Sequence, residues 1–383
     1  MRVALIGTTA GCVINFRGDL IRYLSDLGCV VYAFAIDYDA ETSRLVEELG
    51  GIAVSYNLDR TGIAPVADIV STLRLAKQLR ALKLDLVFSY FTKPVIFATV
   101  AAKLAGVRRR VGMLEGLGHS FTKTPNGPST SARLVKLIQL CLYSLTFPLL
   151  ERLIVLNRDD AKELSAFRFL RCPQVSVLGG IGVDLTVFEQ MPPSGQPTFI
   201  FVGRLLAEKG IFEYVGAARL LKARFPQAEC YLLGAEDKSN PGSLSSEQLS
   251  ELVKDGIVNY VGEVDDVRPW LSKSSVFVLP SYREGVPKST QEALATGRAV
   301  VTTDVPGCRD TVVDGVNGFL VAPWSAQALF EKMVYFVENP EAIFSMGRAS
   351  RELAEKNFDV VKINEHLGTL LLGSAQNLNR PFK

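Results

Sequence analysis

Short apolar runs rich in β-branched residues recur along the chain, separated by longer segments in which apolar residues return every three to four positions. An apolar run with little polar alternation is typical of a parallel strand buried on both faces, and the intervening spacing is typical of an amphipathic helix. Strands that alternate with helices predict parallel sheets covered by helices on both sides. In the first half we expect strands at residues 2–7, 29–35, 52–56, 85–90, 109–114 and 152–156, and helices at 15–27, 40–49, 66–82, 94–105 and 130–149.

The alternation is interrupted at residues 183–197, where prolines, a glycine and polar neighbours predict an interdomain linker. A length of 383 residues suits two domains. We expect an N-terminal domain of residues 1–182, a C-terminal domain of residues 198–358, and a terminal helix with its tail at 359–383. The fold class is α/β, with two Rossmann-like domains facing each other across a cleft. Ligands of such sheets bind beyond the carboxyl ends of the strands, so a ligand is expected in that cleft.

The stretch 279–307 combines a strand end, a loop, a helix and a second strand. Glu284 lies in the loop and Glu292 on the helix, which Pro287 is expected to begin and Gly297 to end. Free backbone N–H groups at a helix N-terminus form an anion site, and Lys288 can add its charge. The alternative is an ordinary strand–helix unit with two solvated glutamates.

A second stretch, FVGRLLAEKG at residues 201–210, places two cations after another strand. Arg204 offers a bidentate fork and Lys209 a point charge, a combination that suits a diphosphate. Each residue alone could be a plain solvated charge. Because both stretches follow strands of the same half, we expect them to act together.

Composition bounds the partners and the compartment. The net charge is +2, but residues 86–150 hold eight basic residues against Glu115 alone, which favours an anionic partner for the first domain or a solvated basic surface. Six cysteines without CxxC spacing and only two histidines argue against a zinc site and favour free thiols in a reducing cytoplasm. The opening MRVALIG is interpreted as a strand rather than a signal peptide, and Leu134–Leu150 is interrupted and too short to span a membrane.

The motifs together resemble a retaining glycosyltransferase of family 4, which has the GT-B fold. The resemblance rests on GRLLAEKG at 203–210, the Glu284–Glu292 pair, GGIGVDLTVF at 179–188, VGEVDDVRPWL at 261–271 and DGVNGFLVAP at 314–323. FRGDL at 16–20 and EGLGHSFT at 115–122 are similar to the branch acting on polyprenyl-diphosphate-linked glycans. The resemblance implies that the C-terminal helix returns to the first domain.

The resemblance also implies roles for individual residues. Arg204 and Lys209 would bind the diphosphate of a UDP-sugar, Glu292 the ribose, and Glu284 the transferred sugar. His119 would face the sugar, although a lone loop histidine can equally be a bystander. The expected catalytic residues are Arg204, Lys209, Glu284 and His119, and the expected nucleotide-sugar contacts are Gly11, Arg204, Lys209, Val264, Glu284, Gly285, Val286, Pro287, Lys288 and Glu292. No metal is expected, since Asp37-Tyr38-Asp39 ends a strand of a parallel fold rather than forming a DxD metal motif.

The implied activity is transfer of an N-acetylhexosamine or hexose to a lipid-diphosphate-linked saccharide, in O-antigen, capsule or glycoprotein-glycan assembly. Cations near an apolar helix at 130–149 suggest that the enzyme sits peripherally on the inner leaflet of the cell membrane; the alternative is a core helix with solvated cations. The cations are Arg108, Arg109, Arg110, Lys123, Arg133 and Lys136. Two other functions stay open: a UDP-N-acetylglucosamine 2-epimerase-like isomerase, which would need more acid–base groups, and a non-catalytic nucleotide-sugar-binding protein.

Overall fold

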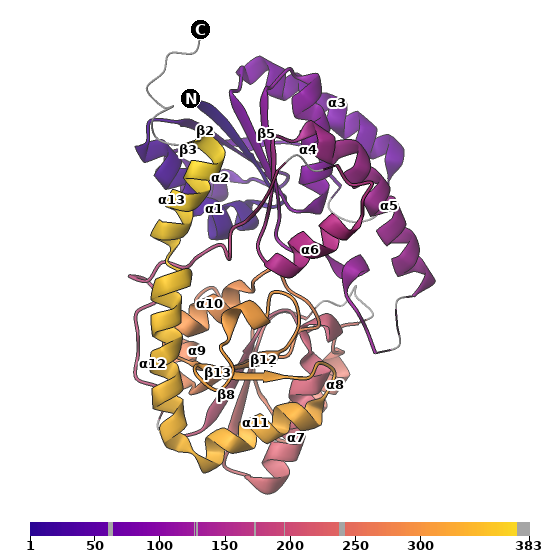
Figure 1. Ribbon diagram of the computed structural model, residues 1–383. Coiled ribbons are helices and arrows are strands. Elements are labelled where there is room, and N and C mark those ends of the chain that lie inside the picture. The colour runs from indigo at the N-terminus through magenta and orange to yellow at the C-terminus, as the bar shows by residue number, and fades with distance from the viewer. Residues whose placement is uncertain are drawn as a thin grey trace. The chain divides into compact units, whose positions relative to one another are not determined.

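The computed structural model describes residues 1–59, 64–125, 127, 129–171, 174–194, 196–236 and 242–373 (Figure 1). Cys172, residue 195 of the expected linker and residues 374–383 of the expected tail lie outside these ranges. The chain forms two compact units. The first unit comprises Met1–Ser120, Ser129–Leu178 and the chain from Val361 onward. The second unit comprises Gly179–Val360, together with a short segment that starts at Phe121.

The first unit is built on a parallel sheet whose described strands follow the order β3-β2-β1-β4-β5-β6-β7. Each neighbouring pair is parallel, for example Val3 of β1 opposite Val31 of β2 and Leu86 of β4. The strands are β1 (Arg2–Ile6), β2 (Val30–Ala35), β3 (Gly51–Ser55), β4 (Leu86–Tyr90), β5 (Arg109–Leu114), β6 (Arg152–Val155) and β7 (Val175–Val177). The helices are α1 (Ala10–Asp26), α2 (Ala40–Glu48), α3 (Pro65–Leu82), α4 (Thr92–Leu104), η1 (His119–Phe121), α5 (Thr130–Thr146), η2 (Phe147–Leu149) and α6 (Arg158–Ala166).

Strand order assigns these helices to the two faces of the sheet. The connections β1–β2–β3 run one way along the sheet and β3–β4–β5–β6 run the other way. Right-handed crossovers therefore place α1 and α2 on one face and α3, α4 and α5 on the opposite face. Helix α4 packs against both α3 and α5.

The C-terminal helix α13 (Val360–Leu372) packs on the first unit, as predicted. Gly368 lies so close to the ring of Tyr23 in α1 that a Cβ at this position would overlap it. At the end of the helix, Arg109 Nη1 donates to the carbonyl oxygen of Leu372 at 3.2 Å. Leu367 and Leu371 are buried, so the helix contributes core as well as polar contacts.

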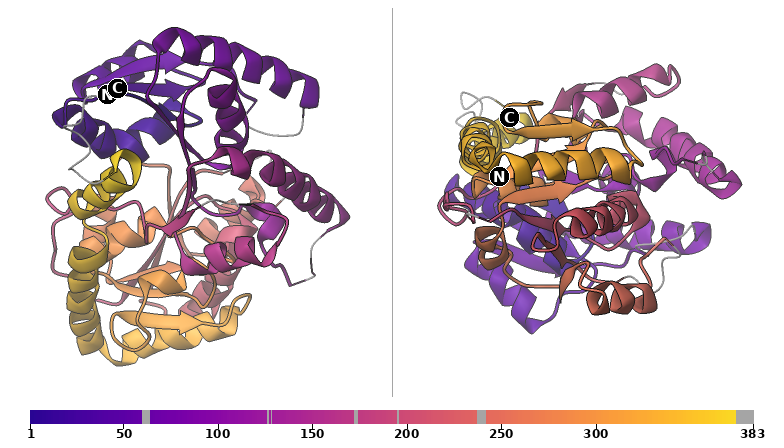
Figure 2. Two further views of the ribbon diagram at one scale, coloured as in Figure 1. Left: turned by 45° about the horizontal axis from the view of Figure 1, so that its top comes forward. Right: turned by 90° about the horizontal axis from the view of Figure 1, so that it is seen from below.

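The second unit holds a parallel sheet whose described strands follow the order β10-β9-β8-β11-β12-β13. Its helices α7 and α11 pack side by side (Figure 2). The strands are β8 (Thr198–Val202), β9 (Glu229–Leu233), β10 (Asn259–Gly262), β11 (Val276–Leu279), β12 (Ala299–Thr303) and β13 (Gly318–Val321). The helices are η3 (Ala207–Lys209), α7 (Ile211–Arg224), α8 (Ser246–Lys254), α9 (Arg268–Lys273), α10 (Lys288–Ala295), η4 (Arg309–Thr311), α11 (Ala326–Glu338) and α12 (Pro340–Asn357). The predicted α/β class is confirmed for both units.

Three arginines of the second unit hold the chain that precedes β8. Arg298 is fully buried and donates to the carbonyl oxygens of Met191 and, at 2.7 Å, Ser274. Arg351 donates to the carbonyl of Phe188 at 2.8 Å and Arg268 to that of Val187 at 3.5 Å. Because three separate carbonyls of this segment accept hydrogen bonds from side chains of the second unit, residues 187–191 are fixed to this unit.

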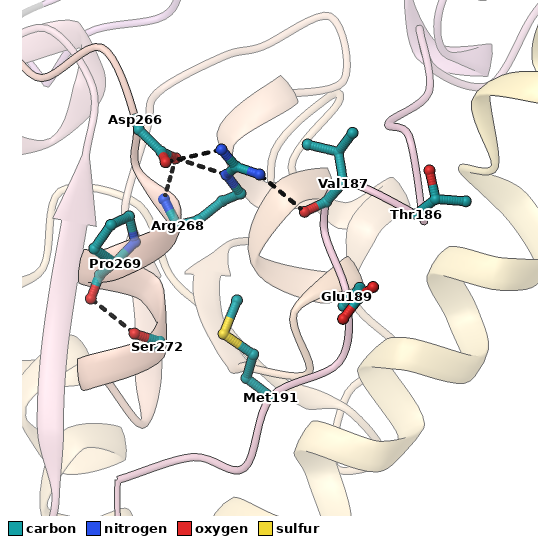
Figure 3. A pocket seen from close by; sticks show the side chains of 8 residues that line it. All are labelled: Thr186, Val187, Glu189, Met191, Asp266, Arg268, Pro269 and Ser272. Atoms are coloured by element: carbon teal, nitrogen blue, oxygen red, sulfur yellow. Dashed lines mark hydrogen bonds and ion pairs between the residues drawn. The ribbon is translucent and has the colours of Figure 1, made fainter.

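A cavity of about 440 Å³ lies beside this segment (Figure 3). Its charged lining residues are Glu189, Asp266 and Arg268, and the guanidinium of Arg268 already pairs with both carboxylate oxygens of Asp266 at 2.8 and 2.9 Å. Because this cation is neutralised within the cavity wall, the cavity offers no free charge to an anionic ligand.

Candidate active site

The two motifs of the second unit meet at the point where its strand order reverses. Strand β8 has β9 on one side and β11 on the other, although β11 comes much later in the chain. The loops that leave the carboxyl ends of β8 and β11 are therefore neighbours, and such a switch point is where open α/β sheets bind ligands. The amide of Tyr282 donates to the carbonyl of Glu208 at 2.9 Å and joins the two loops.

Glycine makes this close approach possible. Gly210 has φ +76°, and a Cβ there would overlap the carbonyl oxygen of Pro280. Gly307 has φ +81°, and a Cβ there would overlap the carbonyl oxygens of Glu284 and Gly285. Only glycine adopts these dihedrals at little cost, so the EKG and VPG tripeptides set how tightly the loops pack.

Lys209 and Glu284 form a partly buried ion pair. Nζ of Lys209 lies 2.6 Å from Oε1 of Glu284, and the two side chains are 23% and 11% exposed. Ser281 Oγ donates to the same carboxylate oxygen at 2.8 Å. A carboxylate from the neighbouring loop therefore fixes the lysine. Less conformational entropy is then lost when a ligand binds to its charge.

Arg204 is held less firmly. Its side chain is 56% exposed, and its guanidinium lies 3.8 Å from the carboxylate of Glu208. At this exposure an ion pair contributes about 0–1 kcal/mol, so Arg204 can change partner readily. The pair of cations predicted for a diphosphate therefore consists of one fixed and one adaptable charge.

Glu292 lies on α10 with Lys288 one turn before it. The two charged groups are 3.7 Å apart and the glutamate side chain is 13% exposed. Burial raises the pKa of Glu292 above its ordinary value, although the nearby Lys288 ammonium partly opposes this. A buried carboxylate of this kind is a strong hydrogen-bond acceptor for donors that a ligand would bring.

The loop between the two glutamates is held from behind. Val286 is buried, and its carbonyl accepts from the side-chain amide of Gln291 at 3.1 Å. The other end of that amide accepts from the backbone N–H of Gly182 at 3.0 Å. Pro287 caps α10, and the helix begins at Lys288, one residue later than predicted. Gly285, Val286, Pro287 and Lys288 are thereby brought next to Glu284.

Val264 lies in the loop after β10 and is partly exposed. Its strand is the edge strand of the second sheet, beside β9. Gly262 at the strand end has φ +90°, and a Cβ at this position would meet only the hydroxyl of Tyr260, at 4.0 Å. Its carbonyl accepts a hydrogen bond from the backbone N–H of Gly234 at 2.9 Å. No described hydrogen bond or ion pair joins Val264 to the Lys209–Glu284 pair.

The first unit contains Gly11 and His119. Gly11 lies in the first turn of α1, after β1, with open space around the position of a Cβ. His119 begins the short helix η1 and is exposed. Asp37 and Asp39, which resemble part of a metal motif, have structural partners: Asp37 accepts from the Ala10 amide at 2.6 Å, and Asp39 caps α2. Among the described residues, no group of three or more His, Cys, Asp or Glu is arranged to hold a metal ion.

Sequence reasoning missed a buried charged cluster in this unit. Arg17 of α1 is 2% exposed and forms an ion pair with Glu115, which directly follows β5. The guanidinium also lies 4.7 Å from the ring centre of Tyr90 at the end of β4. The cluster joins the two segments that carry the resemblance to polyprenyl-diphosphate enzymes, FRGDL and EGLGHSFT. The sequence feature that could have revealed this cluster is an arginine on the apolar stripe of α1, four residues after the buried Val13.

Three of the six cations expected at the acceptor or membrane surface have structural partners. Arg109 pairs with Glu151 at 3.0 Å, Arg110 donates to the carbonyl of Leu149 at 2.6 Å, and Lys136 pairs with Glu163 at 3.2 Å. Burial lowers the pKa of Arg110. The other three, Arg108, Lys123 and Arg133, are exposed.

Helix α5 turns an apolar face to solvent. Leu134, Leu137 and Leu145 are 57%, 59% and 70% exposed and return at helical spacing. Among the described helices, the continuous stretch Thr130–Leu149 is long and apolar enough to cross a membrane by length and composition, with 28% of its apolar window buried. The sequence estimate for this region, Leu134–Leu150, was shorter because it ignored the polar first turn.

The chain is similar to known glycosyltransferases. The model of the family described as glycosyl transferases group 1 matches residues 196–339, which contain both motifs. An N,N'-diacetylbacillosaminyl-diphospho-undecaprenol alpha-1,3-N-acetylgalactosaminyltransferase of Campylobacter jejuni is 27% identical, covering 91% of this chain and 92% of its own length. A UDP-Gal:alpha-D-GlcNAc-diphosphoundecaprenol alpha-1,3-galactosyltransferase of Escherichia coli is 25% identical, covering 82% of each chain.

Solved structures show the same fold. A sucrose-phosphate synthase of Thermosynechococcus elongatus superposes with a TM-score of 0.77 at 20% identity, covering 97% of this chain and 98% of its own. HepE of Anabaena, in complex with UDP and glucose, gives a TM-score of 0.76 at 17% identity and covers 97% and 99%. The matched family model and the relatives from C. jejuni and E. coli favour glycosyl transfer over an isomerase or a silent binding protein. The chain is therefore a glycosyltransferase with the GT-B fold, and its residues 196–339 match the family described as glycosyl transferases group 1.

Proposed function

We propose that this enzyme transfers a sugar from a UDP-sugar to a saccharide linked to a polyprenyl diphosphate, with retention of the anomeric configuration. The observation that carries the proposal is the Lys209–Glu284 pair at the carboxyl ends of neighbouring strands, with Arg204 and Glu292 on the same two motifs. The named substrates of the relatives from C. jejuni and E. coli support the lipid-diphosphate acceptor, and the UDP in the HepE structure supports the donor. We expect the product to enter a surface glycan such as O-antigen, capsule or a glycoprotein glycan.

The donor would bind through its charged and hydroxylated parts. Lys209 and Arg204 take the diphosphate, and Glu292 accepts hydrogen bonds from the ribose hydroxyls. The uracil lies near Val264, and Gly11 in the first turn of α1 closes on the diphosphate. Glu284, held by Lys209 and Ser281, accepts hydrogen bonds from the transferred sugar, while the backbone of Gly285, Val286, Pro287 and Lys288 steers its hydroxyls.

The chemistry follows from where charge develops. The bond between the anomeric carbon and the diphosphate oxygen breaks, the sugar gains positive character, and the leaving diphosphate gains negative charge. Cations beside that oxygen stabilise the transition state, at about 3–4 kcal/mol for each well-placed group. The acceptor hydroxyl enters on the face that the diphosphate leaves, and a phosphate oxygen takes its proton. Metal-independent catalysis is expected, because the two cations supply the charge that a divalent ion would otherwise supply.

The proposal also assigns the parts of the chain. Residues 1–182 would bind the acceptor, 183–197 form the linker, 198–358 bind the nucleotide sugar, and 359–383 form the terminal helix and tail. His119, in the exposed helix η1, would contact the sugar.

We further propose that the first unit rests on the inner leaflet of the membrane through α5. Leu134, Leu137 and Leu145 would enter the lipid interface, and the exposed Arg133 would meet anionic headgroups at about 1 kcal/mol. Leu137→Ser/Leu145→Ser should reduce co-sedimentation with anionic vesicles. Equal sedimentation of the variant and the wild type would remove α5 from the membrane surface.

A UDP-release screen tests the central proposal. The enzyme is incubated with UDP-GalNAc, UDP-GlcNAc, UDP-Gal or UDP-Glc, with and without a lipid-diphosphate-linked sugar. We expect acceptor-dependent UDP release with at least one donor, and an α-linked product by NMR. UDP binding without acceptor-dependent release under any pairing would point instead to a silent binding protein.

A further inference from the structure

A second helix of the first unit exposes an apolar stripe. Val66, Ile69, Val70 and Leu73 of α3 are 77%, 60%, 40% and 56% exposed. Their spacing of three, four and seven residues places them on one face of the helix. Scattered exposed leucines are ordinary on protein surfaces, but a continuous stripe of this kind marks a binding surface.

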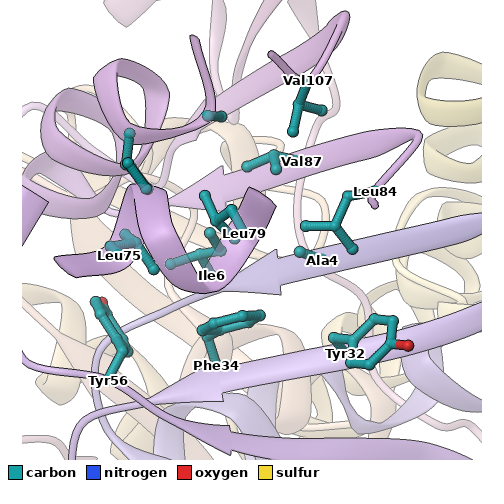
Figure 4. Packing of buried hydrophobic residues seen from close by; sticks show 14 of the residues in the cluster. Ala4, Ile6, Tyr32, Phe34, Tyr56, Leu75, Leu79, Leu84, Val87 and Val107 are labelled. Atoms are coloured by element: carbon teal, nitrogen blue, oxygen red, sulfur yellow. The ribbon is translucent and has the colours of Figure 1, made fainter. Parts of the chain in front are cut away.

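The stripe faces solvent while the rest of α3 is firmly packed. Leu75 and Leu79 join the buried core with Ile6 and Phe34 (Figure 4). Near the start of the helix, Asp68 is 4% exposed and pairs with Lys93 of α4 at 3.4 Å. A helix held at both places cannot rotate to bury the stripe, so its exposure is built into the fold.

Two cations continue this surface toward a cavity of about 510 Å³. Arg74 and Lys77 line the cavity from α3, and Ser55 and Asn57 line it from the end of β3. Both cations are exposed, and no described residue forms an ion pair with either of them. Arg109, Arg110 and Lys136, in contrast, are occupied by structural partners. The cavity also lies at the carboxyl edge of the sheet, where α/β folds bind ligands.

Basic and apolar residues follow one another along α3 in the order that would match the diphosphate and the hydrocarbon chain of a lipid diphosphate. Leu73 and Arg74 are adjacent in sequence, and Lys77 lies one turn beyond Leu73 on the same face. From Val66 to Lys77 the helix rises about 16 Å. Arginine offers a bidentate fork to a phosphate and lysine a point charge, while the stripe buries hydrocarbon at about 25 cal/mol per Å².

We propose that α3 binds the acceptor's lipid diphosphate, with the diphosphate at Arg74 and Lys77 and the first prenyl units along Val66, Ile69, Val70 and Leu73. The assignment rests on the proposed lipid-diphosphate acceptor and gives it a location. The site recognises the linkage rather than the sugar, so it would hold acceptors that carry different saccharides on the same lipid.

Acceptor kinetics test the site. The probe is farnesyl diphosphate as a competitor of the acceptor, with farnesol and inorganic pyrophosphate as its separate halves. For Arg74→Gln/Lys77→Gln we expect an inhibition constant at least about tenfold higher for farnesyl diphosphate, from the loss of two charged hydrogen bonds, and UDP affinity within twofold by calorimetry. Ile69→Ser/Leu73→Ser should weaken farnesyl diphosphate and farnesol but leave pyrophosphate unchanged.

A matched control removes one arginine and one lysine elsewhere in the unit. Arg44→Gln/Lys103→Gln changes exposed residues of α2 and α4 and should leave the inhibition constants unchanged. Circular dichroism and thermal melts confirm folding of every variant. Binding to anionic vesicles without acceptor distinguishes the acceptor's lipid diphosphate from membrane lipids as the ligand of this surface. The Arg74→Gln/Lys77→Gln variant should still bind the vesicles as the wild type does.

Two results would overturn the assignment. Unchanged farnesyl diphosphate inhibition in a folded Arg74→Gln/Lys77→Gln variant would exclude the site. Loss of vesicle binding with unchanged inhibition would make the surface a general membrane contact. Either result leaves wild-type turnover intact, whereas failure of the proposed function would appear as no turnover of any lipid-diphosphate acceptor by the wild type.

Discussion

Lys209 and Arg204 are assigned to the same diphosphate but differ in how the fold holds them. Lys209→Gln removes the cation that lies 2.6 Å from the largely buried carboxylate of Glu284. Breaking a buried pair by removing one partner costs about 3–5 kcal/mol, and partial exposure of this pair reduces that to about 2–3 kcal/mol. Arg204→Gln removes a pair that is 3.8 Å long and 56% exposed on the arginine side, at almost no cost in stability.

The two variants should therefore separate stability from catalysis. For units of this size each kcal/mol corresponds to about 2–4 °C in the melting temperature, so Lys209→Gln should melt about 5–10 °C lower and Arg204→Gln within about 2 °C of the wild type. Both should lose about 100- to 1000-fold in turnover, because each removes a cation that faces charge developing in the transition state. Differential scanning fluorimetry and UDP release under saturating donor measure the two effects.

A second substitution sharpens the comparison. Adding Glu284→Gln to Lys209→Gln removes the carboxylate that had lost its cation, so the double variant should regain most of the melting temperature without regaining turnover. The reasoning would be refuted if Lys209→Gln lost stability but kept its rate, since the pair would then be structural only. Near-wild-type turnover of Arg204→Gln would refute the diphosphate assignment for that residue.

Further outcomes follow at three other sites. Because burial raises the pKa of Glu292, ionisation of its carboxylate destabilises the fold as pH rises through that pKa. Glu292→Gln should therefore raise the melting temperature at neutral pH relative to the wild type. The same variant should bind UDP about 10- to 100-fold more weakly by calorimetry. UDP affinity of the wild type should fall as pH drops through the same raised pKa, whereas that of the variant should not. Arg17→Met should cost about 3–5 kcal/mol in denaturant unfolding by leaving Glu115 buried without its cation, and Arg17→Met/Glu115→Leu should recover much of it. Gly210→Ala should lower stability by at least about 2 kcal/mol, since its Cβ would overlap the Pro280 carbonyl; an unchanged melting curve would contradict the close packing of the two loops.

The sheets were predictable from sequence because strands buried on both faces are nearly uninterrupted apolar runs. Strand β7 (Val175–Val177) was missed, since this short edge strand has partly exposed valines and no apolar run. Helix α6 was also missed because its sequence RDDAKELSA is strongly polar. The available signal was Asn157 as the N-cap with Asp159 and Asp160 in the first turn.

The candidate site was predictable as a set of residues but not as a set of contacts. Sequence placed Lys209 and Glu284 after strands of the same half, 75 residues apart. That β11 lies beside β8 is a property of the strand order, which the local pattern does not encode. The Arg17–Glu115 pair spans 98 residues and the free cations of α3 depend on which other cations find partners. Such long-range pairings arise only when the fold brings distant segments together.

A crystal structure of the enzyme with UDP tests the central claim most directly. The account predicts the diphosphate within hydrogen-bonding distance of Arg204 and Lys209, and the ribose hydroxyls on the carboxylate of Glu292. UDP bound with its diphosphate away from both cations, or with its ribose away from Glu292, would contradict it.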